Sequence, residues 1–218
     1  MKELLPVLLS VSMLYLSCSR TLYDAAINGD TGFIRNYRGD INRPDKNSGK
    51  TALMGAAYYG KTGAVEALIK AHADVNAVNK DGRTALILAA LNGSKDVIKP
   101  LIDAKADVNA ADNSGMTALI LASAGGDASI VKKLIEAGAD VDTADENGTT
   151  ALMEAAITGH VEVINELIVA KADLNKADNG GRTALTLAVE WGQDKAAGVL
   201  KNAGAKGTIL KPSLSDVI

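Results

Sequence analysis

Hydrophobic and polar positions recur along this chain with a fixed spacing. The segment Gly-X-Thr-Ala-Leu begins at Gly49 and returns at Gly82, Gly115, Gly148 and Gly181, a step of 33 residues each time. In each copy a stretch rich in Ala and Leu leads to a second glycine, and apolar residues at i, i+1, i+4 and i+5 follow. This second pattern predicts a helix that buries one face. We therefore expect each unit to contain two short helices that pack against their equivalents in the neighbouring units.

The repeated segment also indicates how each unit begins. Pairs such as Asp81-Gly82 and Asn147-Gly148 are typical of tight turns, in which glycine supplies a positive φ. The threonine is placed to accept a hydrogen bond from a backbone amide at a helix start, and the leucine is expected on the buried face. The threonines are Thr51, Thr84, Thr117, Thr150 and Thr183, and the leucines are Leu53, Leu86, Leu119, Leu152 and Leu185.

The segment DGRTALILAALNG, which begins at Asp81, together with the AKADVNA that follows, resembles the ankyrin repeat. The resemblance extends from Leu22 to about Lys206. It implies an all-α repeat fold, an ankyrin solenoid of helix–turn–helix units with β-hairpin loops. We expect five full repeats after a shortened N-terminal capping repeat. Such an array is stable because neighbouring units bury each other's apolar faces.

This chain departs from the family pattern at the ends and middle of the second helices. The glycine that ends this helix is replaced by His72, Lys105 and Lys171 in three units. We expect these residues to take the left-handed conformation at a cost of about 1 kcal/mol each. Pro100 falls inside a second helix, where an interior proline predicts a local bend.

One motif resembles a site for nucleotides. Gly49-Lys50-Thr51 matches the end of the phosphate-binding P-loop GxxxxGK[ST], but Pro44 occupies the position of its first glycine. Proline has no backbone N–H to offer a phosphate. Lys50 also occupies the variable position of the 33-residue repeat, so we interpret the motif as structural.

Residues for other chemistry are few. The chain has two histidines, a net charge of −3 and the single cysteine Cys18, which excludes an intrachain disulfide. It lacks the clustered basic charge that nucleic acid requires. We therefore expect no catalytic residue, no cofactor, no metal site and no nucleic-acid partner, and a protein that is not an enzyme.

The N-terminal residues differ from the repeats. Residues 1–17 place Lys2 before an apolar run of a length typical of a signal peptide. The sequence YLSC that ends at Cys18 resembles a bacterial lipobox, which implies cleavage before Cys18 and its lipidation. We expect an exported lipoprotein of the periplasm, outer membrane or cell surface. The alternatives are a soluble secreted protein, cleaved near Ser19, and an uncleaved helix. The repeat domain would then cover 18–206 and a tail 207–218.

The resemblance implies protein binding through the hairpin tips and the concave face. Carried over by position, the candidate partner-binding residues are Tyr58, Tyr59, Arg83, Leu91, Asn92, Met116, Ile157, Thr158, Arg182, Glu190 and Trp191. Aromatic residues dominate the energetics of many interfaces, and we expect Leu91 and Ile157 to be exposed. Alternatively, Tyr59 and Trp191 pack against adjacent loops.

The sequence thus predicts a protein–protein interaction module, exported and anchored to a membrane, that binds a protein partner as a monomer. A second hypothesis is an inhibitor or immunity-type protein that blocks an exported enzyme or toxin. A third is an enzyme with a catalytic site of unrecognised kind. The identity of the partner does not follow from the sequence.

Overall fold

The computed structural model describes residues 20–207, so Cys18, the predicted signal peptide and residues 208–218 lie outside the described residues. Each unit contributes two helices. The first helices are α2 (Leu22–Ile27), α4 (Ala52–Tyr58), α6 (Ala85–Leu91), α8 (Ala118–Gly125), α10 (Ala151–Thr158) and α12 (Ala184–Glu190). The second helices are α3 (Thr31–Asn36), α5 (Thr62–Lys70), α7 (Lys95–Asp103), α9 (Ala128–Glu136), α11 (Val161–Val169) and α13 (Asp194–Asn202).

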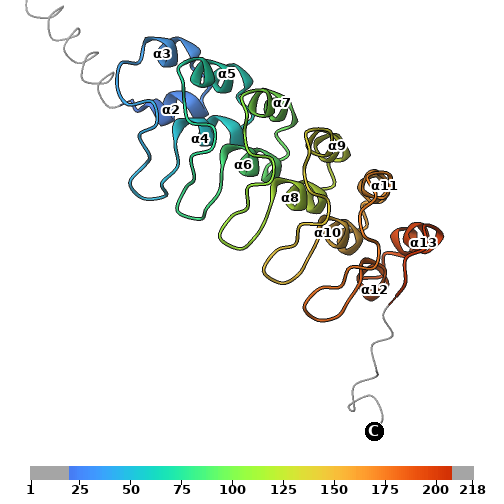
Figure 1. Ribbon diagram of the computed structural model, residues 1–218. Coiled ribbons are helices and arrows are strands. Elements are labelled where there is room, and N and C mark those ends of the chain that lie inside the picture. Colours follow the sequence, from blue (N-terminus) through green and yellow to red (C-terminus); the bar gives the residue numbers. More distant parts are fainter. Residues whose placement is uncertain (1–19, 208–218) are drawn as a thin grey trace, which may run out of the picture.

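The helices form two parallel rows, and the loops between units extend to the same side of the array (Figure 1). Each first helix contacts the first helix of the next unit and the second helix of its own unit. This arrangement confirms the predicted all-helical repeat fold. Among residues 20–207, no helix is long and apolar enough to cross a membrane.

The repeated threonines begin the first helices as predicted. In α4, α6, α8, α10 and α12 the N-cap is threonine, and its Oγ1 accepts a hydrogen bond of 3.3–3.4 Å from the amide three residues later. All five threonines are buried. The cap therefore satisfies a backbone donor that water cannot reach, which makes threonine at this position part of the core.

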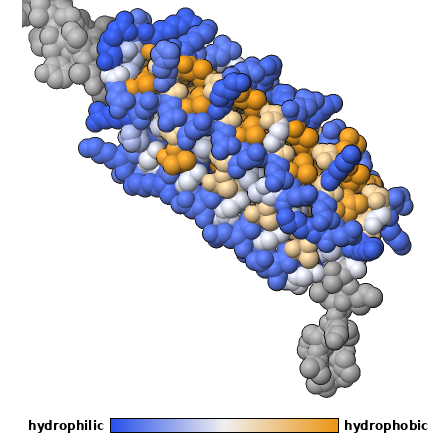
Figure 2. Space-filling model, viewed as in Figure 1, coloured by the Kyte–Doolittle hydropathy of each residue, from blue (hydrophilic) through white to orange (hydrophobic). Residues whose placement is uncertain are grey.

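The core is continuous from unit to unit. The repeated leucines of the first four full units are at most 1% exposed, and small residues such as Ala56 and Ala89 let adjacent first helices approach closely. Hydrophobic residues form a band along the array between hydrophilic margins (Figure 2). One prediction is wrong: Leu185 is only half-buried, because among the described residues no further unit follows α12 and α13.

At the N-terminal end, Ile34 is 1% exposed, and Phe33 and Tyr37 pack against the core at its margin. The rings of Phe33 and Tyr37 lie 6.1 Å apart between centroids. These residues cover the apolar edge of the next unit.

The residues that replace glycine after the second helices do adopt the left-handed conformation. His72, Lys105 and Lys171 have φ of 61°, 68° and 65°, and Gly138 takes the equivalent place with φ of 91°. All three side chains are exposed. The backbone geometry of this turn is therefore imposed by the repeat, even where the residue disfavours it.

Pro100 lies within α7, which continues from Lys95 to Asp103. Proline removes the amide that would donate to the carbonyl of Asp96. Asp96 is exposed, so water can replace the missing donor. The helix is not interrupted, and the bend expected there stays a prediction.

Neighbouring hairpin loops are joined by backbone hydrogen bonds in register. The amides of Lys80 and Asn113 donate to the carbonyls of Ser48 and Asp81 at 3.2 and 2.9 Å, and the later hairpins repeat this contact. The first hairpin is one residue longer than the next. The carbonyl of Lys50 accepts from the amide five residues earlier, that of Asp45, whereas the carbonyl of Arg83 accepts from the amide four residues earlier. The ladder holds the hairpins as one surface beside the first helices.

Candidate functional site

The predicted partner-binding residues lie on the surface formed by the hairpins and the C-terminal ends of the first helices, which we call the inner face. Those on the hairpins are Arg83, Met116 and Arg182, and those at the helix ends are Tyr58, Tyr59, Leu91, Asn92, Ile157, Thr158, Glu190 and Trp191. The residues thus belong to one surface, but their side chains differ greatly in exposure.

Two aromatic side chains of the inner face are open to solvent. Tyr59 is 52% exposed and Trp191 is 62% exposed. They occupy the same position of the repeat, four units apart. Tyr59 also meets the ring of Tyr58 edge to face, with centroids 5.1 Å apart, and Lys50 Nζ lies 5.9 Å from the centroid of Tyr58.

A third tyrosine near this site was missed from the sequence. Tyr23 on α2 packs over Gly55 of α4, where a Cβ would come within 2.8 Å of the tyrosine ring. Burial raises the pKa of Tyr23, and Tyr59 adds to the shift. The signal in the sequence was Gly55, since the same position in other units holds a larger residue such as Leu88 or Leu121.

Asn92 has a structural partner in the preceding unit. Its Nδ2 and the hydroxyl of Ser94 each donate to the carbonyl of Tyr58 at 2.8 Å. Gln193 donates to the carbonyl of Ile157 at 3.0 Å in the same way. These bonds satisfy carbonyls at the ends of first helices, so Asn92 serves to join units as well as to line the inner face.

The two arginines of the hairpins are paired with buried carboxylates. Arg83 Nε lies 2.9 Å from Asp112 Oδ2, and Arg182 lies 2.7 Å from Asp178. Burial works to raise the pKa of Asp112, but hydrogen bonds from Arg83 and from two hairpin amides outweigh it and hold that pKa below its usual value. The pKa of Asp178 is lowered against burial by Arg182 in the same manner. Both arginines therefore brace hairpins.

The remaining candidates divide by exposure. Leu91 is 43% exposed, as expected. The prediction that Ile157 is exposed is wrong, because its side chain is half-buried and packs against the core. Met116 is half-buried in the same way. Thr158 is exposed, although its hydroxyl donates to the carbonyl of Glu154 at 2.8 Å. Glu190 lies near Arg182, with 3.8 Å between their charged atoms.

Charge changes sign along the inner face. The first two hairpins carry Lys46, Lys50 and Lys80, whereas the fourth carries Asp145 and Glu146. Beside the fourth hairpin, Glu154 of α10 is half-buried, and its side chain has no hydrogen bond or ion pair with the described residues. Burial raises the pKa of Glu154, and Asp145 adds to the shift. The inner face is therefore basic near α4 and acidic near α10.

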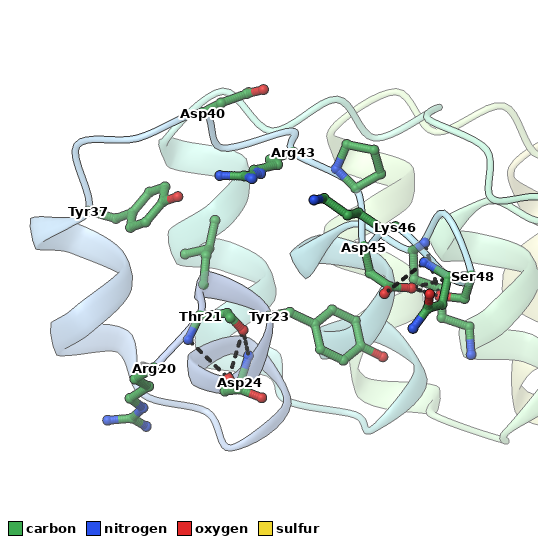
Figure 3. A pocket seen from close by; sticks show the side chains of 14 residues that line it. Arg20, Thr21, Tyr23, Asp24, Tyr37, Asp40, Arg43, Asp45, Lys46 and Ser48 are labelled. Carbon is green, nitrogen blue, oxygen red and sulfur yellow. Dashed lines mark hydrogen bonds between the residues drawn. The ribbon is translucent and has the colours of Figure 1, made fainter. Parts of the chain in front are cut away.

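A hollow of about 830 Å³ opens beside α2 and the first hairpin (Figure 3). Its acidic groups already have partners nearby. Asp24 accepts hydrogen bonds from Thr21, and Asp45 accepts them from Ser48 (Figure 3). Within residues 20–207 no three His, Cys, Asp or Glu residues gather as metal ligands would.

Comparison with known families agrees with this architecture. A family model described as ankyrin repeats (3 copies) matches residues 22–112, 53–145 and 119–210, which together span most of the chain. No curated protein matches the sequence significantly.

Proposed function

This chain belongs to the ankyrin repeat family, and from that premise we propose that it binds a protein partner on its inner face. Ankyrin repeats are protein–protein interaction modules and are generally not enzymes. The observation that carries the proposal is the pair of exposed aromatic residues, Tyr59 and Trp191, at equivalent positions of the first and last full units. Tyrosine and tryptophan are the residue types most enriched among interface hot spots.

The separation of these two residues indicates the size of the partner. First helices pack side by side along the row, and packed helices lie about 8–10 Å apart. Four such steps separate Tyr59 from Trp191 by roughly 35 Å. A partner that contacts both residues must extend over this distance, which favours the surface of a folded protein.

The charges of the inner face add a second requirement. The basic hairpins near Tyr59 favour acidic groups on the partner, and the acidic region around Glu154 favours basic ones. Complementary charges accelerate association and fix orientation more than they increase affinity. The partner is therefore expected to dock in one direction along the array.

The test is capture of a partner from the cell envelope of the source organism, identified by mass spectrometry. Tyr59→Ala and Trp191→Ala should each reduce the affinity of the captured protein, and the double variant should reduce it further. Val169→Ala is the matched control, because Val169 is 79% exposed but lies on α11 in the other row. Far-ultraviolet circular dichroism must be unchanged in all variants. Equal capture by the double variant and the wild type would refute the proposed surface.

We also propose that the protein is exported and anchored through lipid on Cys18, as a periplasmic, outer-membrane or cell-surface lipoprotein. The support is the apolar run before Cys18 in the sequence. Arg20 lies two residues after Cys18 and pairs with Asp30 at 2.6 Å beside α3. A lipid on Cys18 would thus hold the array close to the membrane surface.

Metabolic labelling with a fatty acid tests this anchor. The wild-type protein should be labelled and Cys18→Ala should not. Equal labelling of both, or labelling of neither, would contradict lipidation, and recovery of unlabelled wild type from the medium would favour a soluble secreted protein. If the captured partner is an exported enzyme or toxin that loses activity on binding, the protein acts as an inhibitor of the immunity type.

A further inference from the structure

The last unit presents an apolar surface that earlier units bury. Leu185 on α12 is half-buried, although its equivalents in the four preceding units are at most 1% exposed. Val189 is 65% exposed. Its equivalents are small and buried in every preceding unit, namely Ala57, Ala90, Ser123 and Ala156. The end of the array therefore carries a larger apolar residue than the interior. It lies at a position that no further unit among the described residues covers.

This end surface is partly, but not fully, polar. Lys201 takes the place of the isoleucine found in preceding second helices, such as Ile168, a change expected of a terminal unit that faces water. Val189 has the opposite effect, because an exposed valine leaves apolar surface in contact with water. A hollow of about 470 Å³ lies over this surface. We call it the end hollow, and its lining includes Leu185, Thr186, Val189, Ala197, Gly198 and Gly207.

The chain itself leads into the end hollow. The amide of Lys206 donates to Asn175 Oδ1 at 2.7 Å, just as the amide of Asp173 donates to Asp142 Oδ1 at 2.8 Å one unit earlier. The carbonyl of Lys206 accepts a hydrogen bond of 2.9 Å from Thr183. The repeat geometry thus continues to residue 206. In each earlier unit, the residues after the position equivalent to Lys206 form the hairpin that leads to the next pair of helices.

The sequence after Gly207 is not another repeat. Residues 208–218, TILKPSLSDVI, contain neither the turn glycine nor the Thr-Ala-Leu segment. They do contain two adjacent aliphatic residues, Ile209 and Leu210, immediately after the residue that lines the end hollow. At about 3.3 Å per residue, this segment is long enough to cross the end of α12, whose seven residues rise about 10 Å.

We propose that residues 208–218 fold back over the end hollow, where Ile209 and Leu210 cover Leu185 and Val189. The segment is tethered at Gly207, so its effective concentration at the hollow is in the millimolar range. A second copy of the chain would have to compete with that tethered segment. Covering these residues removes apolar surface from water and closes the apolar end that the last helix pair leaves open within residues 20–207.

Thermal unfolding of the full chain tests the contact through non-additivity. If Val189 faces water, Val189→Ala should leave Tm unchanged or raise it slightly, because alanine is the better helix former. If the tail covers Val189, this change should lower Tm. The double change Ile209→Ser, Leu210→Ser should lower Tm by about 3–6 °C. In the Val189→Ala background the same double change should lower Tm by clearly less, since residues in contact are not additive.

Controls distinguish this contact from its alternatives. Val169→Ala, on the exposed side of α11, should combine additively with the tail change. Unchanged Tm after Ile209→Ser, Leu210→Ser, or full additivity with Val189→Ala, would overturn the proposal. Sedimentation that shows a dimer of the full chain, abolished by Val189→Ala but not by the tail change, would also overturn it, in favour of a second copy at the end hollow.

Discussion

Lys105 ends the second helix of its unit in the left-handed conformation, with φ of 68°. Its side chain is exposed and makes no hydrogen bond or ion pair with residues 20–207. Its amide donates to the carbonyl of Ile102 at 2.9 Å, and its carbonyl accepts from Asn76 Nδ2 at 3.3 Å. Glycine would keep both backbone bonds, so Lys105→Gly changes only the conformational preference of the backbone.

The magnitude follows from two opposing terms. The left-handed conformation costs a residue with a Cβ about 1–2 kcal/mol. Glycine loses more backbone entropy on folding than a residue with a side chain, and this loss costs about 0.5–1 kcal/mol of stability. Lys105→Gly should therefore stabilise the fold by roughly 0.5–1 kcal/mol. His72→Gly and Lys171→Gly should add similar amounts, because the three turns belong to different units and share no partners.

Gly138 allows the reverse substitution as a control. It occupies the equivalent turn with φ of 91°, and a Cβ added to it would meet no atom within 4 Å. Gly138→Lys should thus destabilise the fold by about the amount that Lys105→Gly gains, through strain alone. Lys105→Ala keeps the strain and should leave stability nearly unchanged.

Equilibrium unfolding in urea, followed by circular dichroism, measures these differences. Repeat arrays do not always unfold in two states, so the shift in midpoint should be compared with thermal unfolding. A lower midpoint for Lys105→Gly, or a higher one for Gly138→Lys, would refute the account of these turns.

Four further predictions concern caps, turns and pH. Thr117→Ala should cost about 1 kcal/mol in urea unfolding because it removes a buried N-cap, and Thr117→Ser should restore most of it; equal stability of all three proteins would contradict this. Gly82→Ala should lower Tm more than Gly181→Ala, since an added Cβ would lie 2.8 Å from the amide of Asn113 in the first case and would meet nothing within 4 Å in the second. The pKa of Asp112 is lowered in the fold, so its contribution is present above about pH 4 and is lost as pH falls through the folded pKa; the stability difference between wild type and Asp112→Asn should shrink in acid. The pKa of Glu154 is raised, so its charged form opposes folding at neutral pH; Glu154→Gln should raise Tm at pH 7, and an advantage that persists below pH 4 would contradict this.

Much of the fold could be predicted because its determinants are local and repeated. The threonine caps and turn glycines act within a few residues of themselves, so a 33-residue spacing is enough to place them. The left-handed turns at Lys105 and its equivalents were predictable for the same reason, since Gly138 marks the conformation in another unit.

Exposure on the inner face could not be predicted, because it depends on the neighbouring unit. Leu91 and Ile157 occupy the same position of the repeat, yet only Leu91 is exposed. In the next unit, the equivalent positions hold the small residues Ala124 and Gly125 in the case of Leu91, but Glu190 and Trp191 in the case of Ile157. Larger neighbours cover more surface, and the repeat spacing does not report their size. The extra residue in the first hairpin also could not be predicted from the repeat spacing, because Gly49 still lies 33 residues before Gly82.

The claim that the inner face binds a protein can be tested most directly by photo-crosslinking in cells of the source organism. A photoreactive amino acid placed at Tyr59 or at Trp191 should give a covalent adduct with one and the same protein. The same amino acid at Val169, on the opposite row, should give none. An adduct from position 169 alone, or different proteins from positions 59 and 191, would contradict the account.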